Sequence, residues 1–93
     1  MHELHLMKNL EKKLDEISAD KDIKIKKIYF FVGALAHITE EHFREHMVAI
    51  MHSKSYAGAV LEIEMNQDIH HPQAADIVLE SLDLEEIRQT DIY

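Results

Sequence analysis

The sequence contains no cysteine, which excludes disulfide bonds, thiolate zinc sites and cysteine nucleophiles together. One proline and two glycines in 93 residues leave little room for a flexible linker or a low-complexity segment. No apolar run approaches the roughly 18 residues of a membrane-spanning helix, and the N-terminal segment lacks the apolar stretch of a signal peptide. We therefore expect one domain over residues 1–93, located in the cytoplasm.

Basic residues are also scarce, with 10 Lys and Arg against 18 Asp and Glu and a formal net charge of -8. Proteins that bind nucleic acids or anionic membranes need a basic face, so we expect neither kind of partner. Histidine, in contrast, is abundant, with 8 residues, several of them clustered. Neutral imidazole is a common metal ligand, which makes metal binding the chemistry to examine.

Two segments have the periodicity of amphipathic helices. Residues 4–17 carry apolar side chains three or four positions apart, with charged residues between them. A second helix should begin after Thr39, whose hydroxyl can cap it, with Glu40 and Glu41 in its first turn. We expect this helix to end near Ser53. Its expected buried side chains are Phe43, Met47, Ile50 and Met51.

Three further segments indicate strands. Residues 23–32 end in an apolar, β-favouring run from Ile28 to Val32, which is typical of a central strand covered on both faces. Residues 59–65 alternate with a period of two. Residues 75–86 are ambiguous between a helix and a strand. Ile77 and Leu79, then Leu82 and Leu84, alternate with an offset of one, and this favours a bulged strand.

The order helix, strand, helix, strand, strand predicts an α+β fold, with two helices packed on a three-stranded mixed sheet. The first two strands, connected through a helix, should be parallel. The last two strands should form an antiparallel hairpin across the loop that contains Pro72.

The N-terminal residues Met1, His2 and Glu3 form a candidate metal site. A free amine, two backbone amide nitrogens and the His2 imidazole make a tetragonal all-nitrogen donor set, which selects Ni(II) or Cu(II). The amides must lose their protons, so binding should release protons and strengthen with pH. A histidine at position two is common, and the alternative is a solvated terminus without a function. The bulky His2 should prevent removal of Met1 and so preserve the amine.

A second pattern, H-x-x-E-H, covers His42, Glu45 and His46. On a helix the two imidazoles lie one turn apart and could hold a metal ion, with Glu45 as a base in a small hydrolase. A chain this short offers no peptidase cleft, so we favour two half-exposed structural histidines. The loop pair His70 and His71 could likewise bind a metal ion or simply belong to a solvated loop.

Several segments, taken in order, resemble the HypA-type nickel metallochaperones of hydrogenase and urease maturation. The resemblance covers nearly the whole chain. Its motifs are Met1-His2-Glu3-Leu4, Val32-Gly33-Ala34-Leu35, Ile38-Thr39-Glu40-Glu41-x-Phe43, Gly58-Ala59-x-Leu61-Glu62-Ile63 and Asp76-Ile77-Val78-Leu79-Glu80-Ser81-Leu82-Asp83-Leu84. The resemblance implies that residues 75–86 form a strand.

The resemblance implies a non-enzymatic protein that binds Ni(II) through Met1, His2 and Glu3. Such a protein delivers nickel to an apo nickel enzyme of the hydrogenase or urease type, or to a nickel GTPase. The family's zinc domain, with its two C-x-x-C pairs, is missing here near residues 66–74, so no zinc is expected. This loss motivates an alternative, a paralogue that keeps the fold as a partner-binding or regulatory module without handling nickel. A further metal ligand could come from His5, His42, His46, His70 or His71.

Overall fold

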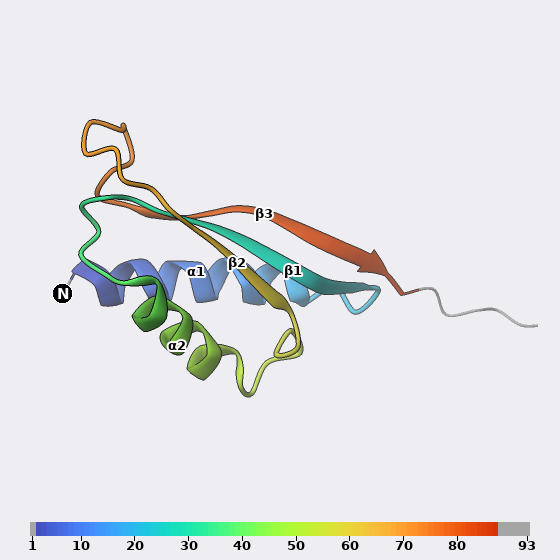
Figure 1. Ribbon diagram of the computed structural model, residues 1–93. Helices are drawn as coiled ribbons and strands as arrows, with labels where there is room; N and C mark the ends of the chain where they lie inside the picture. The colour runs from blue at the N-terminus through green and yellow to red at the C-terminus, as the bar shows by residue number, and fades with distance from the viewer. Residues whose placement is uncertain (1, 88–93) are drawn as a thin grey trace, which may run out of the picture.

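The computed structural model describes the backbone of residues 2–87 and the side chains of residues 6–87. Its elements are α1 (His2–Ser18), β1 (Ile23–Val32), α2 (Glu40–Met51), β2 (Val60–Met65) and β3 (Ile77–Glu86). The predicted α+β fold, with two helices and a three-stranded mixed sheet in the order α-β-α-β-β, is confirmed. Both helices lie on the same side of the sheet (Figure 1). None of the helices within residues 2–87 has the length and apolar character needed to cross a membrane.

The strands are arranged in the order β2-β1-β3, with β1 parallel to β2 and antiparallel to β3. The central position of β1 and its parallel pairing with β2 are therefore confirmed. The predicted hairpin between the last two strands is wrong, because Val32 at the end of β1 pairs with Met65 on one side and Ile77 on the other. The physical reason is that β1 is the most apolar strand, and placing it between two neighbours buries it best.

The predicted bulge in the last strand is confirmed. Phe30 lies opposite Leu79 and Tyr29 opposite Ser81, so Glu80 is an extra residue on β3 with no partner of its own in the register. The bulge restores the alternation, and Leu79 and Leu82 both pack against the core.

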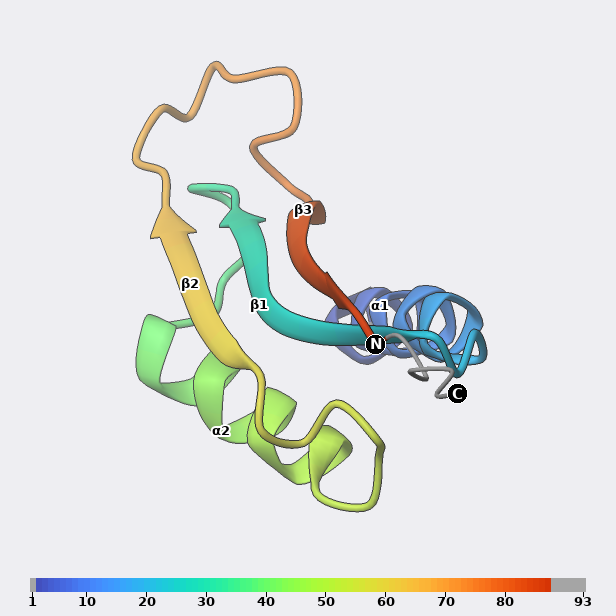
Figure 2. The same ribbon diagram turned by 90° about the vertical axis from the view of Figure 1, so that its right-hand side faces the viewer.

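The core lies between the sheet and the two helices. Met7, Leu10 and Leu14 of α1 are buried, as are Phe43 and other residues of the expected stripe on α2. The rings of Phe30 and Phe43 meet edge to face with centroids 4.9 Å apart, and this contact connects β1 to α2. Figure 2 shows α2 near β2 and α1 near β3, so the two helices cover different parts of the sheet.

Helix α2 begins as predicted, because Thr39 Oγ1 accepts a hydrogen bond from the backbone N–H of His42 at 3.1 Å. Glu40 and Glu41 occupy its first turn, where negative charge favours the positive end of the helix dipole. The helix ends at Met51, slightly before the expected Ser53.

Residues 66–76 pass around the end of β1 and are held there by backbone hydrogen bonds. The Gly33 N–H donates to the Asp76 carbonyl at 2.9 Å, and the Leu35 N–H donates to the Ala74 carbonyl at 2.7 Å. The imidazole of His71 covers the Phe31 ring at a centroid distance of 4.7 Å. Because this loop covers the outer face of β1 at its end, Phe31 is buried together with Phe30 and Val32.

Candidate metal centre

The predicted terminal site lies at the first turn of α1. Met1 lies outside the described residues, as do the side chains of His2, Glu3 and His5, while the backbone of His2 and Glu3 is helical. The first four N–H groups of an α-helix have no acceptor within the helix. The two backbone amides that a terminal chelate requires are therefore not used by the hydrogen bonds of α1.

The start of α1 lies at the end of the sheet where β1 and β2 finish and β3 begins (Figure 1). Residues 66–76 form their loop at the same end. Buried Met7, Leu10 and Leu14 hold the helix against the sheet just beyond its first turn. A ligand bound at the first turn would therefore have a fixed place relative to the fold.

The structure brings His42 and His46 together on α2. Their Nε2 atoms lie 2.9 Å apart, and the ring centroids are 4.6 Å apart with an angle of 53° between the planes. Within residues 6–87, no group of three or more His, Asp or Glu side chains could hold a metal ion. The third ligand of a metallopeptidase site is thus missing from this part of the chain.

The loop histidines have structural contacts. His71 packs on Phe31, and its Nδ1 accepts a hydrogen bond from the backbone N–H of Gln73 at 2.9 Å. The backbone N–H of His70 donates to Asp68 Oδ1 at 2.9 Å. These contacts favour a structural role for His71 in ordering the loop. The His70 imidazole is exposed, and these contacts place no second metal ligand beside it.

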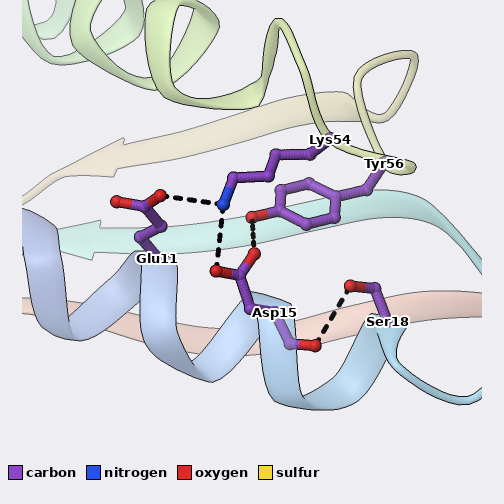
Figure 3. A network of polar contacts seen from close by, with 5 residues as sticks. All are labelled: Glu11, Asp15, Ser18, Lys54 and Tyr56. Atoms are coloured by element: carbon purple, nitrogen blue, oxygen red, sulfur yellow. Dashed lines mark hydrogen bonds and ion pairs between the residues drawn. The ribbon is translucent and has the colours of Figure 1, made fainter.

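A polar network fixes the C-terminal half of α1 to the segment between α2 and β2 (Figure 3). Lys54 Nζ lies 2.9 Å from Glu11 Oε2 and 3.0 Å from Asp15 Oδ2. The Tyr56 hydroxyl donates to Asp15 Oδ1 at 2.9 Å, and Ser18 Oγ donates to the Asp15 backbone carbonyl at 3.3 Å.

The network shifts the protonation equilibria of its members. The hydrogen bond from Lys54 lowers the pKa of Asp15 despite some desolvation, and the Tyr56 hydroxyl acts in the same direction. Glu11 and then Asp15 raise the pKa of Lys54. Burial, followed by the Asp15 carboxylate, raises the pKa of Tyr56. All three groups keep their ordinary charge states at neutral pH, so the network acts as a structural anchor for α1.

Sequence reasoning did not identify this anchor. Glu11 and Asp15 lie one turn apart on the polar side of α1, where the charged pattern alone predicts only a solvated face. The available signal was the pair Lys54 and Tyr56 just after α2, since a lysine and an aromatic residue in a turn can reach back to an acidic helix face.

Comparison with protein-family models, with curated proteins and with solved structures finds no match to this chain.

Proposed function

We propose that this protein is a nickel-binding, metallochaperone-like protein that binds Ni(II) through Met1, His2 and Glu3. The proposal includes no enzymatic activity and places the protein in the cytoplasm, where it would serve the maturation of a nickel enzyme such as a [NiFe] hydrogenase. The observation that carries it is the terminal Met-His-Glu, followed by family-like segments in order along nearly the whole chain.

The chemistry of the donor set supports nickel as the cargo. The Met1 amine, the His2 and Glu3 amide nitrogens and the His2 imidazole would surround the ion with four nitrogens in one plane, an arrangement suited to Ni(II) and Cu(II). The helical start of α1 at His2 leaves both amides without helical acceptors, which supports their use as ligands.

Uptake and release of the metal ion at such a site depend on pH, because the ligand atoms must lose protons to bind. Binding displaces protons from the amine, the imidazole and the two amides, so the complex strengthens as pH rises and weakens when protons return. The partners in this proposal are an apo nickel enzyme and a nickel GTPase.

The missing zinc domain favours one alternative. The chain has no cysteine, and residues 66–76 close the fold without a zinc site. A paralogue that keeps this fold as a partner-binding or regulatory module would tolerate that loss. Such a paralogue would have no need of the intact Met1-His2-Glu3, and for this reason we place nickel handling first.

Calorimetric titration of Ni(II) into the untagged protein, with its native N-terminus, tests the proposal. We expect one tightly bound ion per chain with proton release above about pH 7. His2→Ala removes the imidazole, and affinity should fall at least tenfold, which corresponds to about 1.4 kcal/mol. Acetylation of the Met1 amine removes that ligand directly and should have a comparable effect.

The matched control is the pair of single variants His42→Ala and His46→Ala, which should leave this tight site unchanged. If His2→Ala binds the first nickel ion as the wild type does, the terminal site is wrong and the paralogue becomes the better account.

A further inference from the structure

The pair His42 and His46 is the second place where this chain offers nitrogen ligands to a metal. Both residues lie on α2, one turn apart, and each ring presents its Nε2 to the other at 2.9 Å. In the metal-free protein this distance suits an N–H···N hydrogen bond, in which one ring donates and the other accepts. A metal ion would replace the shared hydrogen, with both rings then carrying their proton on Nδ1.

The two ring nitrogens are close enough to bind one metal ion. With metal–nitrogen bonds of about 2.0–2.1 Å, two ligands at a right angle lie about 2.9 Å apart, while two ligands at a tetrahedral angle lie about 3.3 Å apart. The 2.9 Å of the metal-free pair is within about 0.4 Å of both spacings, so a small movement of the rings suffices for binding. Imidazole suits Ni(II) and Cu(II), which adopt octahedral or tetragonal geometries with water in the remaining positions.

The residues around His42 and His46 favour the binding of a cation, and the pair is accessible to solvent. His42 is exposed and His46 is half-buried. Glu41 and Glu45 are exposed beside them on the same helix, and Arg44, the one Lys or Arg within α2, points its guanidinium to Glu40 and to the Leu61 carbonyl. Buried Phe43 and Met47 fix the helix on which both rings are mounted.

We propose that His42 and His46 form a second, solvent-open metal site that binds Ni(II) or Cu(II) through both Nε2 atoms in neighbouring coordination positions. Water fills the remaining positions, because residues 6–87 bring no third ligand to the pair. The site is separate from Met1-His2-Glu3 and does not depend on the function proposed above. It differs in spin state as well, since two imidazoles and several waters give a weak ligand field and a paramagnetic Ni(II).

The experiment uses the full chain with His2→Ala in every variant compared, which removes the imidazole ligand of the terminal chelate. Ni(II) is titrated into this protein and followed by calorimetry and by ¹H NMR of the imidazole signals. We expect one ion per chain, with paramagnetic broadening confined to the imidazole signals of His42 and His46 among the histidines. Either His42→Ala or His46→Ala should lower the affinity at least tenfold.

A composition-matched control tests whether nickel affinity depends on the spacing of the two histidines or only on the number of histidines in the chain. The double substitution Glu41→His with His42→Glu keeps every residue type but places the two histidines five positions apart, about 140° around the helix. This variant should lose affinity as the alanine variants do. Equal nickel affinity in the rearranged variant, or broadening centred on His37, His52, His70 or His71, would overturn the site. A failure of the proposed terminal site does not affect this outcome, because the His2 imidazole is absent from every protein compared.

Discussion

At the scale of single residues, the closure of the fold depends on a close backbone approach at Gly33. A Cβ built on Gly33 would lie 2.1 Å from the Ala74 carbonyl oxygen, and backbone atoms cannot move aside as a flexible side chain can. The two hydrogen bonds that connect residues 33–35 to residues 74–76 depend on this approach. Gly33 directly follows the strand predicted over residues 23–32, but the sequence pattern does not reveal the tertiary contact that requires glycine there.

Gly33→Ala should therefore lower the free energy of unfolding by about 1–3 kcal/mol, as overpacked sites do. The matched control is Gly58→Ala. A Cβ at Gly58 has no neighbour within 4 Å, and neither glycine has a positive φ. The control should be neutral or stabilising by about 0.4–1 kcal/mol, because alanine restricts the unfolded chain. Urea denaturation measures both variants, and equal stabilities would contradict the close approach.

A second prediction at this scale concerns acid. Because the pKa of Asp15 is lowered in the folded protein, the unfolded chain takes up this proton first. The carboxylate then stabilises the fold above its ordinary pKa of 3.8, and this contribution is lost as pH falls through the lower folded value. Its size should stay below about 1 kcal/mol, since the Lys54 and Asp15 side chains are 23% and 44% exposed.

Asp15→Asn keeps an oxygen acceptor for Tyr56 but removes the charge. Urea midpoints measured between about pH 5 and pH 3 should therefore fall less steeply for Asp15→Asn than for the wild type. Asp15→Ala should cost about 1–2 kcal/mol more than Asp15→Asn at neutral pH, because the buried Tyr56 hydroxyl loses its acceptor. Parallel acid profiles for the wild type and Asp15→Asn would refute the role given to the charge.

At the scale of elements, periodicity predicted both helices, the range of β1 and the strand character of residues 77–86. The offset between Leu79 and Leu82 even predicted the bulge at Glu80. The pairing partner of β3 was the part that the pattern could not give. Alternation indicates which face of a strand is buried but not which neighbour lies at its edge, and the short connection to β3 suggested a hairpin. Residues 66–76 instead cross the end of β1 to reach β3. They can do so because two strand spacings are only about 10 Å.

The cap of α2 gives the prediction at this scale. Thr39→Ala removes the side-chain acceptor for the His42 N–H, and the free energy of unfolding should fall by about 1 kcal/mol. Thr39→Ser retains a hydroxyl and should stay close to the wild type. Chemical denaturation compares the three proteins. A loss of similar size in Thr39→Ser would indicate that the threonine methyl group, rather than the cap, stabilises the helix.

At the scale of the whole molecule, the core formed by the sheet and two helices should be sufficient for folding without metal. Residues 6–87 contain no group of three metal-binding side chains, and the chain cannot form a thiolate zinc site. Treatment with EDTA should therefore leave the melting temperature within about two degrees of the untreated sample. A large drop in melting temperature would indicate a structural site that involves His37, His42, His46, His70 or His71.

The central claim, a planar nitrogen chelate at Met1-His2-Glu3, is tested most directly by the magnetic state of the first nickel ion bound. Four nitrogens in a plane around Ni(II) give a low-spin, diamagnetic and yellow complex. The NMR spectrum of the untagged protein with one equivalent of Ni(II) should therefore stay sharp, with the His2 imidazole signals shifted and those of His42 and His46 unchanged. Paramagnetic broadening at that first equivalent, with the His2 signals unmoved, would contradict the account.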